Sequence, residues 1–146
     1  MIVIGIGNAI HTFAGMQLRL ACRDIMLRQK QEEPAGMAKM TPAYNLPCRY
    51  VLHTVGPVVQ GRVTQRDQEL LASCYRSCLE LALAHGCRTV AFPSISTGVY
   101  GYPIAQAASV ALKAIMEDLR THDHPCRVRM VCHTEDAANI YRQTYN

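Results

Sequence analysis

Residues 92–103 concentrate the side chains of this 146-residue chain that could hold a ligand. A buried apolar run ends at Phe92, and polar or glycine positions follow: Ser94, Ser96, Thr97, Gly98 and Gly101. Glycine lets the backbone approach a ligand closely, and Pro103 suits the first turn of a helix. Because unpaired backbone N–H groups near a helix start attract anions, this segment could hold a phosphate group.

Two tyrosines extend this chemistry. Tyr100 and Tyr102 could offer flat surfaces to a sugar or a base. The alternative is a tight strand-to-helix turn whose hydroxyls only cap the helix, and the residues alone leave both interpretations open. The segment has no lysine, which excludes a Walker-type loop, and Gly5 and Gly7 form only half of a dinucleotide-binding motif.

The other chemistry-bearing side chains favour structural roles. The seven cysteines are odd in number and have apolar neighbours, which predicts reduced thiols buried as small hydrophobes. Cys74 and Cys78 share a helix face and could bind zinc, but core packing is the preferred interpretation. We expect His53 to make a structural hydrogen bond, and Asp67 and Asp118 to be exposed helix charges. No catalytic residue and no metal site is predicted.

Composition excludes several functional classes. With 49% hydrophobic and 18% charged residues, residues 1–146 are expected to form a single globular domain. The net charge of +4 comes without a basic run, so it suits an anionic ligand and no nucleic-acid partner is expected. Residues 1–7 lack the features of a signal peptide, and no apolar run reaches membrane length. We therefore expect a cytoplasmic protein with no membrane partner.

Hydrophobic periodicity predicts the elements that position these residues. Strands are expected at residues 2–4, 37–41, 49–54, 89–95 and 128–132, and helices at 8–28, 67–84, 104–119 and 135–145. This alternation predicts an α/β fold, a three-layer α/β/α sandwich with a mainly parallel sheet. Ligands in such folds bind outside the carboxyl ends of the strands, where residues 5–8 and 94–103 are expected to lie.

Three motifs in one order carry a family resemblance. They are NAIHTFAG at residues 8–15, HTVGP at 53–57 and PSISTGVYGYP at 93–103. Together they resemble the macro domains, which bind ADP-ribose and hydrolyse ADP-ribosyl groups. Residues 8–28 and 41–57 are most similar to the microbial zinc-containing macro domains that remove ADP-ribose from proteins.

The resemblance implies a binding site. The backbone from Ser96 to Tyr100 would hold the diphosphate, Tyr100 or Tyr102 would pack against the distal ribose, and residues 5–9 would face that ribose. His133 and Thr134 would lie near adenine. The expected ligand-binding residues are therefore Gly5, Gly7, Asn8, Ala9, Ser94, Ser96, Thr97, Gly98, Val99, Tyr100, Gly101, Tyr102, His133 and Thr134.

The start of the chain departs from the family pattern. The family places an aspartate just before the NAIHTFAG segment, where this chain has Gly7, and residues 1–7 lack the Cys and His that bind zinc in close relatives. In the family, a strand ending in an Asn-Ala-Ala-Asn-like segment precedes the first helix, and an acidic residue further upstream contacts adenine, but this chain has neither. We therefore expect a macro-like domain without its usual N-terminal strands, without zinc or another cofactor, and with a sheet edge open to homo-oligomerisation.

Three functions follow from these observations. The first is hydrolysis of ADP-ribose from modified protein or from a related ADP-ribose derivative, by attack of water on the anomeric carbon. The second is a non-catalytic reader of ADP-ribose, favoured by Gly7 at the usual acid position. The third is an inactive truncated domain. The expected partner is ADP-ribose or an ADP-ribosylated protein.

Overall fold

The computed structural model describes residues 2–4, 36–98, 100–122 and 127–146. From residue 50 onwards their elements alternate between strand and helix, as the sequence predicts. In chain order they are β1 (Ile2–Ile4), β2 (Ala38–Pro42), β3 (Tyr50–Thr54), α3 (Gln65–Ala84), β4 (Thr89–Pro93), α4 (Ile104–Thr121), β5 (Arg127–Val131) and α5 (Glu135–Tyr145). The helix expected at residues 8–28 lies outside the described residues.

The described strands form one five-stranded sheet in the order β2-β3-β1-β4-β5. β1 pairs in parallel with both β3 and β4, and β4 pairs in parallel with β5. Only β2, at one edge, runs antiparallel to its neighbour β3. The prediction of an α/β fold with a mainly parallel sheet is confirmed.

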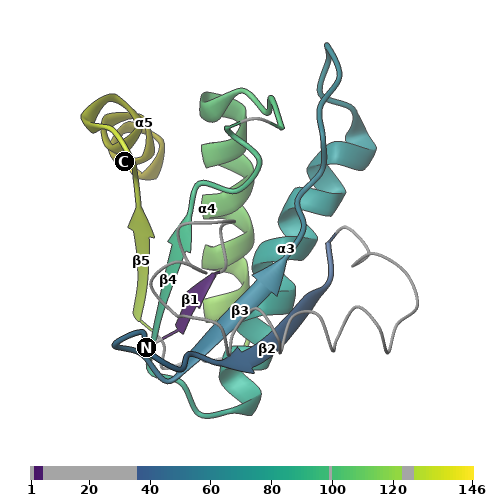
Figure 1. Ribbon diagram of the computed structural model, residues 1–146. Helices are drawn as coiled ribbons and strands as arrows, with labels where there is room; N and C mark the ends of the chain where they lie inside the picture. The colour runs from purple at the N-terminus through teal and green to yellow at the C-terminus, as the bar shows by residue number, and fades with distance from the viewer. Residues whose placement is uncertain (1, 5–35, 99, 123–126) are drawn as a thin grey trace.

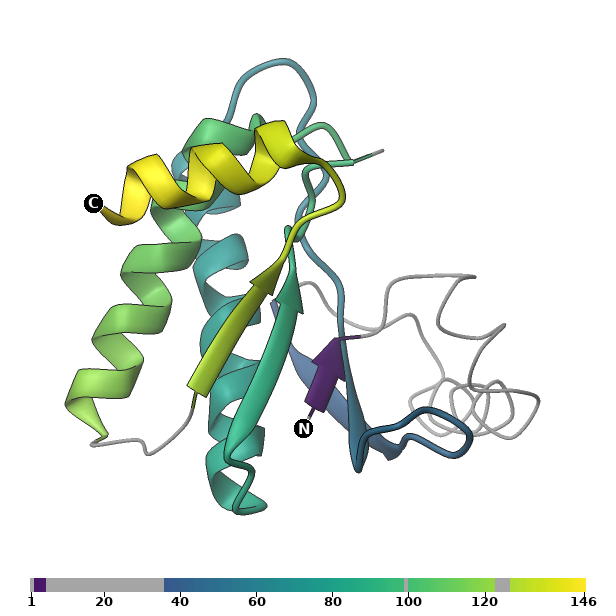
Figure 2. The same cartoon turned by 90° about the vertical axis from the view of Figure 1, so that its left-hand side faces the viewer.

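One helical layer covers the sheet in the described part of the chain. The β3-α3-β4 and β4-α4-β5 connections move in the same direction across the sheet, and right-handed crossovers of this kind place their helices on the same face. α3 and α4 do lie together on one side of the strands (Figure 2). The expected layer on the other face depends on residues outside the described ranges.

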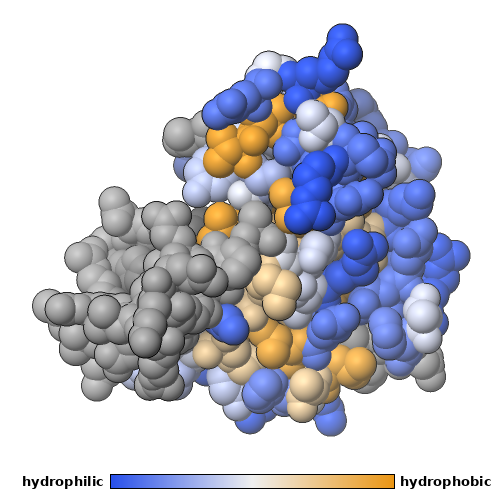
Figure 3. Space-filling model, turned by 90° about the vertical axis from the view of Figure 1, so that its right-hand side faces the viewer, coloured by the Kyte–Doolittle hydropathy of each residue, from blue (hydrophilic) through white to orange (hydrophobic). Residues whose placement is uncertain are grey.

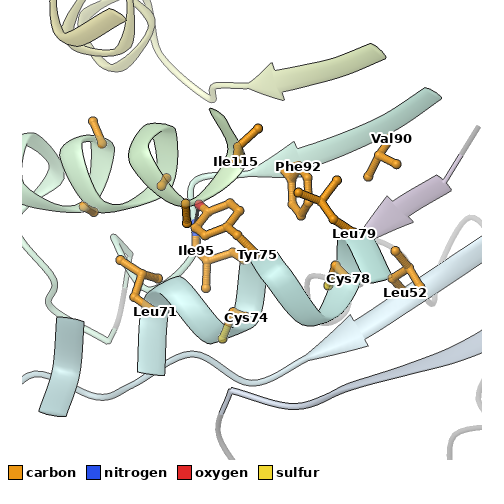
Figure 4. Close-up of a cluster of buried hydrophobic side chains, with 14 of the residues drawn as sticks. Leu52, Leu71, Cys74, Tyr75, Cys78, Leu79, Val90, Phe92, Ile95 and Ile115 are labelled. Atoms are coloured by element: carbon orange, nitrogen blue, oxygen red, sulfur yellow. Dashed lines mark hydrogen bonds between the residues drawn. The ribbon is translucent and has the colours of Figure 1, made fainter. Parts of the chain in front are cut away.

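The core lies between this sheet and α3 and α4. Tyr75 of α3 packs against Phe92 of β4 in a tilted arrangement, with ring centroids 4.9 Å apart, and both side chains are fully buried (Figure 4). The buried side of α3 consists of Leu71, Cys74, Tyr75, Cys78, Leu79 and Ala82. Burial raises the pKa of the Cys78 thiol, as expected for a core cysteine that stays reduced.

α3 begins two residues before the position expected from the sequence. Thr64 is its N-cap, because the Thr64 hydroxyl accepts from the Asp67 amide while the Asp67 carboxylate accepts from the Thr64 amide. Asp67 therefore belongs to a capping box.

The surface on the side of α3 and β2 is mostly hydrophilic, with small hydrophobic patches (Figure 3).

α4 packs against α3 through small side chains. Ala107, Ala108, Ala111 and Ala114 are all buried, so the two helices can approach closely. Asp118 of α4 is only 5% exposed and lies 3.4 Å from the Nδ1 atom of His122, which corrects the expectation that it is an exposed charge. Among the helices described, none combines the length and apolar character required to cross a membrane.

Candidate functional site

The carboxyl ends of β1, β3, β4 and β5 lie at the same edge of the sheet (Figure 1). Three described segments leave the strands at this edge: residues 55–63 after β3, residues 94–103 after β4 and residues 132–134 after β5. We call residues 94–103 the β4–α4 loop. The second and third segments contain the candidate ligand-binding residues from Ser94 to Thr134, so the topology brings these candidates to one end of the sheet.

Two tyrosines form hydrogen bonds with the first residues of the β4–α4 loop. The Tyr75 hydroxyl donates to the Pro93 carbonyl and accepts from the Ile95 amide, with both distances 3.3 Å. The Tyr141 hydroxyl of α5 shares a hydrogen bond of 2.7 Å with the Ser94 hydroxyl. The expected ligand contact Ser94 is thus already bonded to the protein.

The β4–α4 loop then turns through two left-handed positions. Ser96 has a φ of 66° and Gly101 a φ of 77°, and for serine this conformation is uncommon. The turn is closed by bonds from the Tyr102 amide to the Ser96 carbonyl, 2.9 Å, and from the Gly101 amide to the Gly98 carbonyl, 3.1 Å. Ser96, rather than Gly98, takes the first left-handed position.

Three backbone donors of this turn have no internal acceptor. Among the described residues, the N–H groups of Ser96, Thr97 and Gly98 donate to no atom. The Thr97 hydroxyl donates back to the Ser94 carbonyl at 3.0 Å. Consecutive unpaired amides of this kind suit an anion such as a phosphate group.

The start of α4 differs from the starts of the neighbouring helices. The N-cap of α4 is Pro103, which makes no side-chain capping bond, and the first turn of α4 carries no acidic residue. In contrast, α3 and α5 are capped by the hydroxyls of Thr64 and Thr134 and carry acids in their first turns. The helix that follows the β4–α4 loop therefore adds no negative charge there.

The segment after β3 packs tightly on this loop. The Val59 amide donates to the Tyr100 carbonyl at 2.8 Å. A Cβ atom added to Gly56 would lie 2.1 Å from the Ser96 Oγ atom, so only glycine fits at this position. A close approach to a residue 40 positions away leaves no signal in the local sequence around Gly56.

The two tyrosines of the loop behave differently. The Tyr100 side chain is 40% exposed and can contact a ligand, whereas the Tyr102 ring is 2% exposed and belongs to the core. The expectation that the Tyr102 ring offers an open flat surface is therefore corrected. Burial also raises the pKa of the Tyr102 hydroxyl.

The remaining predicted residues have mixed outcomes. His133 and Thr134 are exposed at the carboxyl end of β5, and the Thr134 hydroxyl caps α5 by accepting from the Ala137 amide at 3.1 Å. Gly98 is exposed, and a Cβ added there would meet no atom within 4 Å. The expected contacts outside the described residues are Gly5, Gly7, Asn8, Ala9 and Val99.

Structural roles are seen for His53, Cys74 and Cys78. His53 shares a hydrogen bond of 2.9 Å with the Thr41 hydroxyl across β2 and β3, as expected. Cys74 and Cys78 are free thiols buried in the core. No group of three His, Cys, Asp or Glu side chains within these ranges could hold a metal ion.

Known proteins are similar to this chain in sequence and in fold. Residues 3–111 match the Macro domain family. A protein-ADP-ribose hydrolase of Treponema medium is 54% identical over 119 residues, which cover 82% of this chain and 45% of that protein. An O-acetyl-ADP-ribose deacetylase of Salmonella gallinarum is 47% identical over 138 residues, covering 94% of this chain and 75% of that protein.

A solved structure agrees with these relatives. A mutant of the Oceanobacillus iheyensis macrodomain, solved with ADPR, superposes with a TM-score of 0.91 at 36% identity and covers 99% of this chain and 83% of that one. The chain spans about half the length of the protein-ADP-ribose hydrolases that it matches. From the family match, the relatives and the shared fold, we conclude that the chain belongs to the macro domain family.

Proposed function

We propose that this chain binds ADP-ribose on the β4–α4 loop and hydrolyses ADP-ribose from modified protein or from a related ADP-ribose derivative. The observation that carries the binding proposal is the row of unpaired N–H groups at Ser96, Thr97 and Gly98. The names of the relatives, a protein-ADP-ribose hydrolase and an O-acetyl-ADP-ribose deacetylase, support the two substrate classes.

The chemistry of the loop suits a diphosphate. Residues 94–103 contain no lysine or arginine, so backbone donors would carry the phosphate contacts. Each hydrogen bond to a charged group contributes about 1.5–3 kcal/mol. The exposed Tyr100 ring lies next to these donors in the chain and would pack against the distal ribose. His133 and Thr134, at the end of β5, would lie on the adenine side.

In the hydrolysis reaction, water attacks the anomeric carbon and the bond to the leaving group breaks. A loop that grips the diphosphate fixes the ribose relative to that water, and such positioning can contribute several kcal/mol to catalysis. We assign no catalytic residue. Neither a carboxylate nor a histidine occurs in residues 94–103, so the group that activates water would come from elsewhere in the chain.

The same observation favours a second candidate function. A loop with donors for a diphosphate but no acid or base could serve a reader that binds ADP-ribose without turnover. The two functions differ in one measurement. Release of free ADP-ribose from an ADP-ribosylated protein supports the hydrolase, whereas saturable binding to the same protein with no release supports the reader.

The proposal also includes the cellular compartment of the protein and its association with a second copy. The five cysteines in the described residues are free, which supports a reducing compartment such as the cytoplasm. β5 has one strand neighbour among the described residues, β4, so its other edge could pair with a second copy of the chain. Sedimentation across a range of protein concentrations tests the second point.

Titration calorimetry with ADP-ribose tests the binding proposal. Gly98→Glu should weaken binding by orders of magnitude, because its carboxylate would repel the diphosphate and block the donors, at about 1.4 kcal/mol per tenfold change in affinity. The substitution should leave the fold intact, because Gly98 has no positive φ and a Cβ meets no atom there. Ser96→Ala should cost less, because the backbone donors remain.

Gln60→Glu is the matched control. It adds the same charge at an exposed position in the neighbouring segment and should keep wild-type affinity. Equal affinity of the wild type and Gly98→Glu, or no heat from the wild type at millimolar ligand, would mean that the β4–α4 loop is only a structural turn.

A further inference from the structure

We propose that the hydroxyls of Tyr75 and Tyr141 are positioning groups that hold the β4–α4 loop in its donor-presenting conformation. The two tyrosines come from α3 and α5, and they bind consecutive residues at the loop entry: the Pro93 carbonyl, the Ser94 hydroxyl and the Ile95 amide. The identity of the bound ligand, ADP-ribose, rests on the function proposed above.

Tyr75 is built to bind backbone. Its side chain is fully buried, and its hydroxyl lies 3.3 Å from both the Pro93 carbonyl and the Ile95 amide. Figure 4 shows the Tyr75 side chain extending from α3, beside Phe92, toward Ile95. A phenylalanine would fill the same apolar space, so packing alone does not require the hydroxyl.

Tyr141 ties the C-terminal helix to the same point. It is the only buried side chain of α5, at 5% exposure, and its hydroxyl lies 2.7 Å from the Ser94 Oγ atom. The neighbouring Tyr145 is 65% exposed, and its hydroxyl makes no hydrogen bond within the described part of the chain. Among the described residues, α5 therefore hydrogen-bonds to the β4–α4 loop through one side chain.

The direction of the Tyr75 hydrogen bonds can be assigned by counting protons. The Pro93 carbonyl can only accept, so the single proton of Tyr75 goes there, and the Ile95 amide donates to the Tyr75 oxygen. In the bond between Tyr141 and Ser94, either hydroxyl can be the donor.

Together these bonds give each of the three residues at the loop entry, Pro93, Ser94 and Ile95, one phenol partner. Burial raises the pKa of Tyr75 and Tyr141, so both phenols keep their protons at neutral pH and these bonds stay intact.

The next residue shows why such a support matters. Ser96 holds a left-handed φ of 66° directly after the supported segment. A strained backbone of this type costs about 1–3 kcal/mol and persists only where its surroundings fix it. The phenols fix the entry of the turn, and the bond from the Tyr102 amide to the Ser96 carbonyl closes its exit. Loss of the entry bonds should let Ser96 relax and turn its N–H away.

Tyr-to-Phe variants of the whole chain test this proposal by calorimetry with ADP-ribose. Tyr75→Phe should weaken affinity about tenfold, and Tyr141→Phe should weaken it about threefold, since it removes a more distant support. Tyr50→Phe and Tyr145→Phe remove hydroxyl groups that do not bind the loop entry. Their affinity for ADP-ribose should stay within about twofold of the wild type.

Two further measurements distinguish a positioning role of these tyrosines from a purely structural role. Leu79→Val lowers the stability of the core but leaves the hydroxyl groups of Tyr75 and Tyr141 in place. It should therefore lower the melting temperature but keep ADP-ribose affinity. Hydrogen exchange at the Tyr102 amide reports closure of the turn without any ligand. This exchange should accelerate in Tyr75→Phe and Ser94→Ala, but not in Tyr50→Phe or Leu79→Val.

The outcomes are distinct. Wild-type affinity together with wild-type Tyr102 exchange in Tyr75→Phe would overturn the positioning proposal. If Tyr75→Phe does not fold, Ser94→Ala decides the question by the same two readouts. If the wild-type chain binds no ADP-ribose, the proposed function fails, and the exchange rates still establish whether the tyrosines hold the loop.

Discussion

Strands β4 and β5 lie side by side in parallel, and each has five residues, yet their environments differ. Val90 and Phe92 of β4 are buried, whereas β5 has no buried residue and exposes Arg127, Arg129 and Val131. β4 has strand neighbours on both sides, while β5 has one among the described residues. Position in the sheet, rather than strand propensity, therefore decides how much each side chain contributes.

The segments that follow these strands continue the contrast. After β4, the chain is held by hydrogen bonds from α3 and α5 and leaves three backbone donors unpaired at its turn. After β5, the exposed His133 and the cap residue Thr134 lead into α5. The segment after β4 thus carries a strained turn at Ser96, whereas the described residues that follow β5 include none with a positive φ.

The largest difference in unfolding free energy is expected between two substitutions at paired positions of β4 and β5. Phe92 pairs with Met130 in the register of β4 and β5. Phe92→Ala should lower the free energy of unfolding by about 3–5 kcal/mol, because a fully buried ring leaves a cavity. Met130→Ala should cost clearly less, about 1–2 kcal/mol, because Met130 is only partly buried. Urea unfolding of both variants measures this, and equal costs would contradict the comparison.

A smaller effect is expected where the segment after β3 meets the β4–α4 loop. A Cβ at Gly56 would meet the Ser96 Oγ atom at 2.1 Å and the Ile95 Cγ2 atom at 2.6 Å. Gly56→Ala should therefore cost about 1–3 kcal/mol of stability, as overpacking does, and weaken ADP-ribose binding as the loop shifts. In Gly98→Ala the added Cβ meets nothing, so stability should change by less than about 0.5 kcal/mol.

The smallest effect concerns thiols and pH. Burial raises the pKa of Cys78 in the core and that of Cys132 after β5, but Arg142 partly offsets the shift at Cys132. At pH 8, Cys132 should therefore react with iodoacetamide before Cys78 does. Equal rates, followed by mass spectrometry of the peptides, would contradict this order.

The same shift gives stability a defined pH dependence. The folded pKa of Cys78 is raised, so its contribution is fully present below the unfolded value of 9.0 and is lost as pH rises above it. Unfolding free energy should thus be flat near neutral pH and fall above about pH 9.

The sequence predicted the order and type of the described elements because periodic apolar residues set them locally. The first turn of α3 was missed because Thr64 and Asp67 define it through capping rather than through apolar spacing. The burial of Asp118 and of the Tyr102 ring could not be predicted, since both depend on which way a side chain faces after the helices pack.

The site was predictable in part. The glycines and hydroxyls identified residues 94–103, but the left-handed turn fell on Ser96, where no local rule would place it. The support by Tyr75 and Tyr141 joins residues 18 to 47 positions apart, so it had no signature in the segment itself. Local sequence thus revealed which residues could bind, and tertiary contacts determined how they are presented.

The central place of β1 in the sheet has a consequence for folding kinetics. Ile2 pairs with both Tyr50 and Val90, so the earliest strand joins two strands that come much later in the chain. Each of these pairings closes a long loop and gains its stabilising contacts only after that entropy is lost. We therefore expect β3 and β4 to lack their shared neighbour until late in folding, and the docking of β1 to set the rate at which the native sheet forms.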